Sequence, residues 1–364
     1  MKLAIVMPTG CVFSRSRPNS METVAGVLAA HSRYLGSMRI FCDEGATDAV
    51  DLPLHRLPAG LDKRARIEAV AAALKAYGAD CVEYHQQIGN AAAIARRLPR
   101  ARHILYRHNA IEPGGSLIDR MRYGWRYAAF DRIVFVSEAA RAEFAGSHPR
   151  FADRTRAIRN AIDPAGWLAD PDLKEPLIAF SGRAMKEKGV DLLCEALIAV
   201  LTRHPGWRAA LALGDWDKHD AWAAPHVDRL VEAVGERVDV RRSAPLGEVA
   251  NILRRAAIAV VPSVWAEPLG LTALEAHVAG AAVVSSGRGG LKEASGPHAV
   301  YVDDLTARGL AEAIERLIED PTSRLALARD GQAYALAQHS PAARAAELDA
   351  LRDEVMSAPP ARRR

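Results

Sequence analysis

The chain has 364 residues, of which 49% are hydrophobic and 25% are charged, and its formal net charge is +4. This length predicts two soluble, globular domains rather than one. No apolar run approaches the roughly 18 residues that a membrane-spanning helix requires. The four cysteines are scattered, without a C-x-x-C pair. We therefore expect neither a zinc site nor a disulfide framework.

The two halves of the chain differ in charge. Residues 1–170 contain 24 Lys and Arg against 17 Asp and Glu, whereas residues 171–364 contain 24 against 27. The basic first half favours an anionic surface or substrate as a partner. The first residues, MKLAIVMPTG, lead into a strand without a signal-peptide pattern, so we expect a cytoplasmic protein.

Strand and helix patterns alternate along the chain, which is typical of parallel sheets covered by helices on both faces. In the first half we expect strands over residues 3–7, 39–41, 81–84, 104–106 and 133–136, with helices over 22–30 and 65–77. In the second half we expect strands over residues 177–180, 208–213, 238–241, 258–261, 282–285 and 300–302, with helices such as 190–202 and 246–255. The prolines of residues 163–176 predict a linker, so the domains should span 1–170 and 171–340.

A short helix is predicted after the strand at 258–261. The N-terminus of a helix presents unpaired amides and a partial positive charge, which suit a phosphate. Here those amides belong to Gly270, Leu271 and Thr272.

Two carboxylates accompany this helix. Glu275 lies one turn beyond Leu271, roughly 6 Å along the axis, where it can reach a ribose hydroxyl. Glu267 precedes the helix and would face whatever lies beyond the diphosphate. Spacing alone favours the alternative, a helix with an exposed acid and a loop acid without a role in binding.

Two cations bracket the turn that follows the strand at 177–180. Arg183 offers a planar fork of donors and Lys188 a mobile point charge. A leaving diphosphate gains negative charge, so its departure requires fixed positive charge more than a base. A solvated basic turn is the alternative.

These segments resemble motifs of the family 4 (group 1) retaining glycosyltransferases. EPLGLTALE, residues 267–275, is similar to their Glu-x7-Glu signature, and SGRAMKEKG, residues 181–189, to their Gly-Arg-x4-Lys-Gly motif. Blocks around Gly214 and at Gly289 and Gly290 also resemble the family in the right order. The RPNSMETVA and YRHNA blocks look most like members that build lipopolysaccharide cores or exopolysaccharides.

The resemblance implies an α/β protein of the GT-B type, with two Rossmann-like doubly wound domains facing a cleft. The first would be the acceptor domain and the second the nucleotide-sugar donor domain. The last helix, 341–358, would pack back onto the first domain.

The resemblance also implies roles for individual residues. Glu267 would hold the sugar or phosphate, Glu275 the ribose, and Arg183 with Lys188 the diphosphate. Gly214 would contribute to the donor site. A front-face route, in which the leaving phosphate assists the incoming hydroxyl, needs no side-chain nucleophile.

Two histidines are further candidates. His85 directly follows a strand, and its family counterpart contacts the donor sugar, so we expect it to position the sugar and to handle a proton. His108 is expected to be structural or on the acceptor side. Either histidine could instead be a buried structural residue.

The first loop departs from the family pattern. Asn19 and Ser20 stand where many members have a Gly-Gly pair that approaches the donor phosphate. The Ser20 amide, with Gly10 earlier in the loop, is expected to contact the donor. Arg15 and Arg17 would bind an anionic acceptor or be solvated.

The segment 117–130 reads LIDRMRYGWRYAAF and mixes cations with aromatic residues. Such a basic, aromatic helix suits an anionic membrane leaflet. Packing of its apolar face into the first domain is the alternative. The candidate membrane or acceptor contacts are Arg120, Arg122 and Arg126.

Together these features predict a retaining hexosyltransferase that uses a nucleotide sugar, with UDP favoured over GDP. Its acceptor would be a saccharide or lipid-linked, in bacterial lipopolysaccharide or polysaccharide biosynthesis, at the inner face of the membrane. We expect no cofactor and no metal, because the 12 scattered histidines show no ligand spacing. We expect no nucleic acid partner.

Three alternatives remain open. A nucleotide-sugar epimerase and a sugar phosphorylase can adopt the same architecture, although no pyridoxal-binding lysine block is found. A non-enzymatic polyanion-binding protein could use the basic first half, for example Arg96, Arg97, Arg100 and Arg102.

Overall fold

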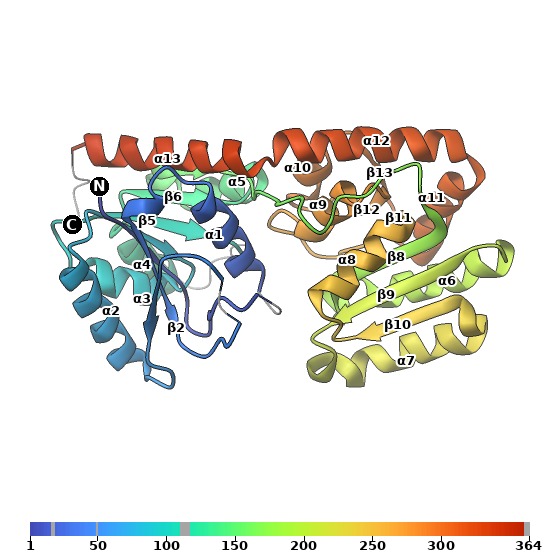
Figure 1. The fold of residues 1–364 in the computed structure, drawn as a ribbon, viewed down its shortest axis with the longest axis horizontal. Coiled ribbons are helices and arrows are strands. Elements are labelled where there is room, and N and C mark those ends of the chain that lie inside the picture. The colour runs from blue at the N-terminus through green and yellow to red at the C-terminus, as the bar shows by residue number, and fades with distance from the viewer. Residues whose placement is uncertain (16–18, 49, 110–116, 360–364) are drawn as a thin grey trace. The chain divides into compact units, whose positions relative to one another are not determined.

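The computed structural model describes residues 1–15, 19–48, 50–109 and 117–359. It contains two compact units, Met1–Ala161 with Pro341–Arg364, and Ile162–Ser340. Each unit is built on one parallel sheet with helices packed on it (Figure 1).

The first unit has a seven-stranded sheet in the order β3-β2-β1-β4-β5-β6-β7. Its strands are β1 (Leu3–Val6), β2 (Met38–Asp43), β3 (Leu54–Leu57), β4 (Cys81–His85), β5 (Arg102–Arg107), β6 (Arg132–Phe135) and β7 (Thr155–Ala157). Its helices are α1 (Ser20–Ala30), α2 (Lys63–Tyr77), α3 (Ile88–Ala95), α4 (Leu117–Tyr127), α5 (Glu138–Ser147) and α13 (Pro341–Ser357), with short 3-10 turns η1 (Leu35–Ser37) and η2 (Pro149–Arg154).

The second unit has a six-stranded sheet in the order β10-β9-β8-β11-β12-β13. Its strands are β8 (Glu175–Arg183), β9 (Arg208–Gly214), β10 (Val238–Arg242), β11 (Ala256–Val261), β12 (Ala282–Ser285) and β13 (Ala299–Tyr301). Its helices are α6 (Val190–Arg203), α7 (Trp216–Val234), α8 (Leu246–Arg255), α9 (Leu271–Val278), α10 (Leu291–Ser295), α11 (Ala307–Glu319) and α12 (Pro321–Gln338), with 3-10 turns η3 (Lys186–Lys188) and η4 (Gly235–Arg237).

Both sheets are doubly wound. In each unit the first strand lies between the second and the fourth strand in chain order. β1 therefore lies between β2 and β4, and β8 lies between β9 and β11. The direction of winding therefore reverses beside β1 and beside β8. Ligands of such sheets bind at this switch point, beyond the carboxyl ends of the strands.

The central strands of both sheets are buried on both faces, as expected for parallel sheets covered by helices. In β8, Ile178 and Phe180 join the apolar cluster formed with α6, α7 and α11. Leu177 and Ala179, which alternate with them, are equally buried. Near-continuous apolar runs such as 256–261 follow from this two-sided burial.

The segment 163–176, expected as a linker, packs within the second unit. Gln332 Nε2 donates hydrogen bonds to Ala169 O and Val278 O, each at 2.8 Å. Asp172 pairs with Arg329. The first unit accordingly ends at Ala161, earlier than the expected residue 170.

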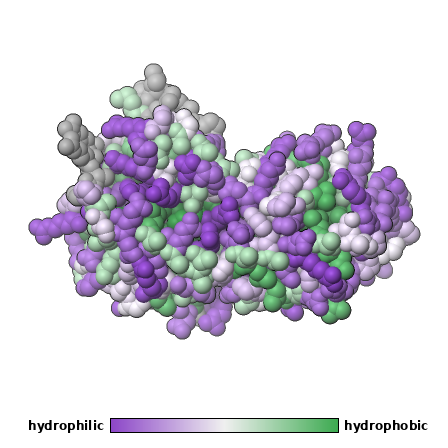
Figure 2. Space-filling model, turned by 90° about the horizontal axis from the view of Figure 1, so that it is seen from above, coloured by the Kyte–Doolittle hydropathy of each residue, from purple (hydrophilic) through white to green (hydrophobic). Residues whose placement is uncertain are grey.

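Helix α13 packs against α1 in the first unit. Its buried residues include Leu348, Leu351 and Val355. No helix within the described ranges combines the length and apolar character needed to cross a membrane. On the face shown in Figure 2, hydrophobic side chains form small areas interspersed with hydrophilic ones.

Candidate functional site

The turn after β8 and the loop after β11 are in close contact at the switch point of the second sheet. Val264 N donates a hydrogen bond to Glu187 O at 2.9 Å. Gly189 has a φ of +69°, and a Cβ there would lie 2.2 Å from Pro262 O. Glycine is therefore required at this position both for the left-handed backbone and for the close approach.

Lys188 and Glu267 form an ion pair where these segments meet. Lys188 Nζ lies 2.5 Å from Glu267 Oε1, and Ser263 Oγ donates to the same oxygen at 2.6 Å. Glu267 is only 6% exposed. Its other oxygen, Oε2, accepts no hydrogen bond from any described residue, so it can accept one from a substrate hydroxyl.

Two glycines hold the backbone of Glu267. Gly290 N donates to Glu267 O at 2.7 Å, and Gly289 pairs with Glu267 in an isolated parallel bridge. Gly289 has a φ of +62°, and a Cβ there would lie 2.3 Å from Glu267 O. The position of the carboxylate is thus fixed from both its backbone and its side chain.

Helix α9 begins beside this carboxylate, as the sequence predicts. Gly270 precedes it with a φ of +104° and supplies no side-chain cap. Leu271 and Thr272 in the first turn are partly exposed. Their end of the helix is a suitable site for an anion, because its amides carry partial positive charge.

Glu275 lies in the second turn of α9. Burial raises the pKa of its carboxyl to about 7, and the charge of Lys188 acts in the opposite direction. The Glu275 carboxyl therefore titrates near neutral pH. Both protonation states can accept a hydrogen bond from a hydroxyl group.

The last residues of β8 and β9 lie side by side. Arg183 is opposite Gly214 in the register, and Ala184 N donates to Gly214 O at 2.8 Å. Arg183 is exposed and forms no salt bridge with any residue of the described ranges. The second unit thus brings together Arg183, Lys188, Glu267, Glu275, Gly214 and the start of α9, all of which the sequence singled out.

The loop after β1 is different, because several of its described amides are already bonded to carboxylates of the same unit. Gly10 N donates to Asp43 Oδ2 at 2.7 Å, and Arg66 in turn donates to Asp43 Oδ1. Val12 N and Asn19 N donate to the two oxygens of Glu22, at 2.7 and 3.2 Å. A donor phosphate at this loop would have to displace the carboxylates.

The start of α1 is also capped from within. Asn19 Oδ1 accepts from Met21 N and Glu22 N, both at 3.0 Å, which completes a capping box. Ser20 is the first residue of the helix and is exposed. Arg15 is exposed as well, whereas Arg17 lies outside the described residues.

His85 and His108 lie in contact at the ends of β4 and β5. His85 Nε2 is 2.9 Å from Glu83 Oε1, and His85 Nδ1 is 2.7 Å from His108 Nε2. Both rings are buried and stack with that of Tyr106. Burial lowers the pKa of His108 well below its usual value, so this ring is neutral.

Sequence reasoning missed the residues behind these histidines. Burial acts to raise the pKa of Glu83, but the charge of Arg352 and the bond to His85 lower it to about 2. Arg352 is fully buried and donates to Glu83 Oε2. Glu83 left one signal in the sequence, since it is a charged residue inside an otherwise apolar strand pattern. Arg352 left none.

Helix α4 is anchored at one end and exposed along its apolar stripe. Tyr127 is 2% exposed and packs edge-on against Phe144, whereas Met121 is 76% and Trp125 58% exposed. The expected alternative, that the apolar face packs into the domain, therefore holds for Tyr127 but not for Met121 and Trp125.

Several cations surround this stripe. The guanidinium of Arg96 stacks on Trp125 at 3.2 Å, and that of Arg126 lies 5.3 Å from the ring of Tyr123. Arg122 is exposed. Arg120 is in the helix, but its side chain lies outside what the structure describes.

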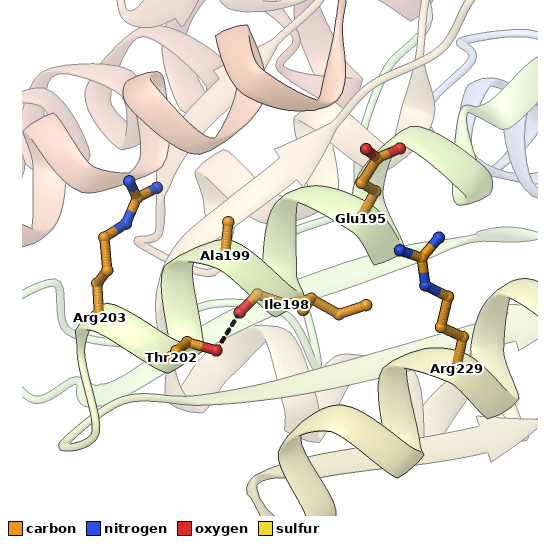
Figure 3. Close-up of a pocket in the computed structure, with 6 residues that line it drawn as sticks. All are labelled: Glu195, Ile198, Ala199, Thr202, Arg203 and Arg229. Atoms are coloured by element: carbon orange, nitrogen blue, oxygen red, sulfur yellow. Dashed lines mark hydrogen bonds between the residues drawn. The ribbon is translucent and has the colours of Figure 1, made fainter.

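One surface hollow of about 310 Å³ is distinct from these sites (Figure 3). It lies between later turns of α6 and α7 and is lined by Glu195, Ile198, Ala199, Thr202, Arg203 and Arg229. None of these residues belongs to a strand-end loop. Among the described residues, no three His, Cys, Asp or Glu side chains are grouped so that they could hold a metal ion.

Comparison with solved structures defines the class of fold. HepE of Anabaena, solved in complex with UDP and glucose, superimposes with a TM-score of 0.80 over 97% of this chain and 100% of its own, at 17% identity. Sucrose-phosphate synthase of Thermosynechococcus elongatus gives 0.75 over 99% and 100%, at 20% identity. The fold is the GT-B fold, with two doubly wound domains.

The sequence matches define the family of each domain. Residues 29–165 match the family model described as Glycosyltransferase Family 4, and residues 175–320 match that described as Glycosyl transferases group 1. Both units of the chain therefore carry glycosyltransferase domains.

Two glycosyl-transferring enzymes are similar in sequence to part of this chain. Alpha-maltose-1-phosphate synthase of Mycolicibacterium smegmatis is 32% identical over 227 residues, which cover 53% of this chain and 55% of that protein. D-inositol 3-phosphate glycosyltransferase of Corynebacterium aurimucosum is 29% identical over 235 residues, covering 63% and 53%. The chain thus spans about half the length of the curated relatives it matches.

Proposed function

We propose that this chain is a retaining, metal-independent glycosyltransferase that moves a hexose from a nucleotide sugar to a saccharide or lipid-linked acceptor in bacterial lipopolysaccharide or polysaccharide biosynthesis. The observation that carries the proposal is the switch point of the second sheet, where Lys188 pairs with Glu267 ahead of the uncapped start of α9, and Arg183 lies at the end of the neighbouring strand β8. Cations and amides of this kind stabilise a leaving diphosphate.

Each residue has a part in the proposed reaction. Arg183 and Lys188 bind the diphosphate as it leaves, and Glu275 accepts hydrogen bonds from the ribose. Glu267 Oε2 accepts a hydrogen bond from the sugar. His85 and His108 position the sugar and the acceptor. UDP is favoured as the nucleotide, since HepE was solved with UDP and glucose.

A hydrolysis screen tests the proposal, with water as a slow acceptor. The chain is incubated with UDP-glucose, UDP-galactose and GDP-mannose, with and without excess EDTA, and nucleotide release is measured. Proton NMR of the first product determines its anomeric configuration and reveals an epimerised sugar. We expect UDP release, a retained α-anomer and no loss in EDTA. No release from any donor would contradict the proposal, and an inverted or epimerised product would replace it.

We further propose that the acceptor is presented at an anionic membrane surface and that α4 contacts it. Met121 and Trp125 would enter the interface, and Arg122, Arg126 and Arg96 would attract the headgroups, each by roughly 1 kcal/mol. Sedimentation with phosphatidylglycerol vesicles should show binding that weakens with salt.

The control for this membrane proposal compares two double variants, each of which removes two positive charges, one pair from α4 and the other from the second unit. The double variant Arg122→Ser with Arg126→Ser should lose binding. Arg229→Ser with Arg308→Ser, on exposed positions of the second unit, should retain it. Equal binding by both would exclude α4 from the interface.

A further inference from the structure

The centre of the first sheet contains a buried ionic network that reaches α13. Arg352 donates to Glu83 Oε2 from Nε at 3.1 Å and from a terminal nitrogen at 2.8 Å, and to Asp349 Oδ1 at 2.7 Å. Ser32 Oγ also donates to Asp349, at 2.8 Å. The exposed fractions of Arg352, Glu83 and Asp349 are 0%, 1% and 2%.

Net stability is a weak explanation for this network. A buried ion pair adds little net stability compared with apolar residues of similar volume, and the rest of this sheet face offers such residues, for example Ile104 and Ile5. The network places a carboxylate that is ionised at neutral pH against His85.

That carboxylate decides which ring nitrogens carry protons. Glu83 Oε1 can only accept, so His85 Nε2 carries a hydrogen and donates it. In the neutral ring His85 Nδ1 then accepts, and His108 Nε2 must be the donor of the 2.7 Å bond. While the His85 ring is neutral, the proton on each ring is therefore at Nε2, and Nδ1 of His108 is left as an acceptor.

We infer that Glu83 and Arg352 are positioning residues for the histidine pair, and that α13 sets the tautomer of both rings. This inference rests on the proposed function, because it assigns these histidines to the reaction. Neither Glu83 nor Arg352 contacts substrate; each acts through His85.

Glu83→Gln provides a direct test, since it preserves shape and inverts the hydrogen bond. Arg352 presents only donors to Oε2, so the amide oxygen must take that place and the amide NH2 must face His85. The NH2 donates, hence His85 Nε2 must accept, and the protons of both rings move to Nδ1. The matched control is Glu354→Gln, which breaks the surface ion pair of α13 with Arg132 without reaching the histidines.

Two readouts separate this inference from the proposed function. Nitrogen-15 NMR of ring-labelled histidines, assigned with His85→Asn and His108→Asn, reports the tautomers without substrate. We expect Nε2–H in the wild type and the control, and Nδ1–H in Glu83→Gln. For UDP-glucose hydrolysis we expect kcat to fall about 10²-fold in Glu83→Gln with KM changed less than about threefold, and no change in the control.

Arg352 is tested by charge rescue. Arg352→Lys should keep the Nε2–H tautomers and turnover within about tenfold, whereas Arg352→Met should lose both. Unchanged tautomers in Glu83→Gln would overturn the inference, as would equal loss of turnover in Glu83→Gln and Glu354→Gln. If the wild type does not hydrolyse UDP-glucose, the proposed donor fails while the tautomers still decide the positioning role.

Discussion

The two sheets have the same winding, yet their switch-point loops are built in opposite ways. After β8 and β11, Arg183 is left without an ion pair among the described residues and Gly270 leaves α9 uncapped. After β1, the carboxylates of Asp43 and Glu22 accept the loop amides, and Asn19 caps α1. The second unit leaves Arg183 and the start of α9 open to an anion, although Lys188 is paired with Glu267. In the first unit, several loop amides are bonded to carboxylates of the same unit.

The difference shows that a doubly wound fold provides the place for a phosphate but not the site. Partial positive charge at a helix N-terminus exists in both units. A helix N-terminus can bind a substrate anion only where its amides do not already donate to side chains of the same chain. On this basis the second unit alone should bind the diphosphate.

The largest expected effect is the loss of a cation from the second unit. Lys188→Ala should reduce turnover of a nucleotide sugar by about 10²-fold or more, as should Arg183→Ala, because each removes charge that stabilises the leaving diphosphate. Lys186→Ala, an exposed lysine in the same 3-10 turn, is the matched control for steady-state kinetics. Near-normal turnover in both Lys188→Ala and Arg183→Ala would contradict the proposed difference between the loops of the two units.

Next in size is the backbone support of Glu267. Gly289→Ala places a Cβ 2.3 Å from Glu267 O at a φ of +62°, so the loop must shift. We expect a loss of about 2–3 kcal/mol in the free energy of unfolding and weaker donor binding. Gly247→Ala serves as control, because a Cβ there meets nothing within 4 Å and lies in helix α8. Urea titration measures the free energy of unfolding, and calorimetry measures nucleotide-sugar binding. Equal stability of the two variants would show that Gly289 does not hold the backbone of Glu267.

A smaller effect is expected from the pH dependence of stability. The pKa of Glu275 is about 7 in the folded protein, above its value in an unfolded chain. The folded state therefore binds the proton more tightly and loses stability as pH rises from about 4.5 to 7. Glu275→Gln removes that loss. Its stability relative to wild type should increase by about 1–3 kcal/mol between pH 5 and pH 8.

The measurement for Glu275 is urea unfolding at a series of pH values. The exposed Glu232→Gln on α7 is the control and should show no such trend. A difference between Glu275→Gln and wild type that stays constant with pH would show that the carboxyl ionises normally.

The smallest expected effect concerns the loop after β1, whose amides donate to carboxylates of the same unit. Glu22→Gln should change nucleotide-sugar affinity by less than about threefold, although it weakens the two bonds that Glu22 accepts and destabilises the fold by about 1 kcal/mol. Isothermal calorimetry measures the nucleotide-sugar affinity of Glu22→Gln and of Lys188→Ala, so that the two losses can be compared. A tenfold loss of affinity in Glu22→Gln would place the first loop in the donor site after all.

The sequence alone predicted the architecture and the candidate residues of the second unit. Apolar runs, prolines and glycines gave the alternation of strands and helices, because two-sided burial of parallel strands leaves a local signal. Arg183, Lys188, Glu267 and Glu275 lie close to strand ends in the chain, so their convergence followed from the fold class. The edge strands β3 and β7 were missed, because they are short and partly exposed.

Only the tertiary structure decided how the first unit is arranged. Glu83 and Arg352 are 269 residues apart, and no local pattern connects positions at that separation. The same holds for Gly10 and Asp43, which turn an expected phosphate contact into an internal bond. The physical reason is that hydrogen bonding and burial act between neighbours in space. A charged residue in a sequence therefore shows that a partner must exist, but not which residue it is.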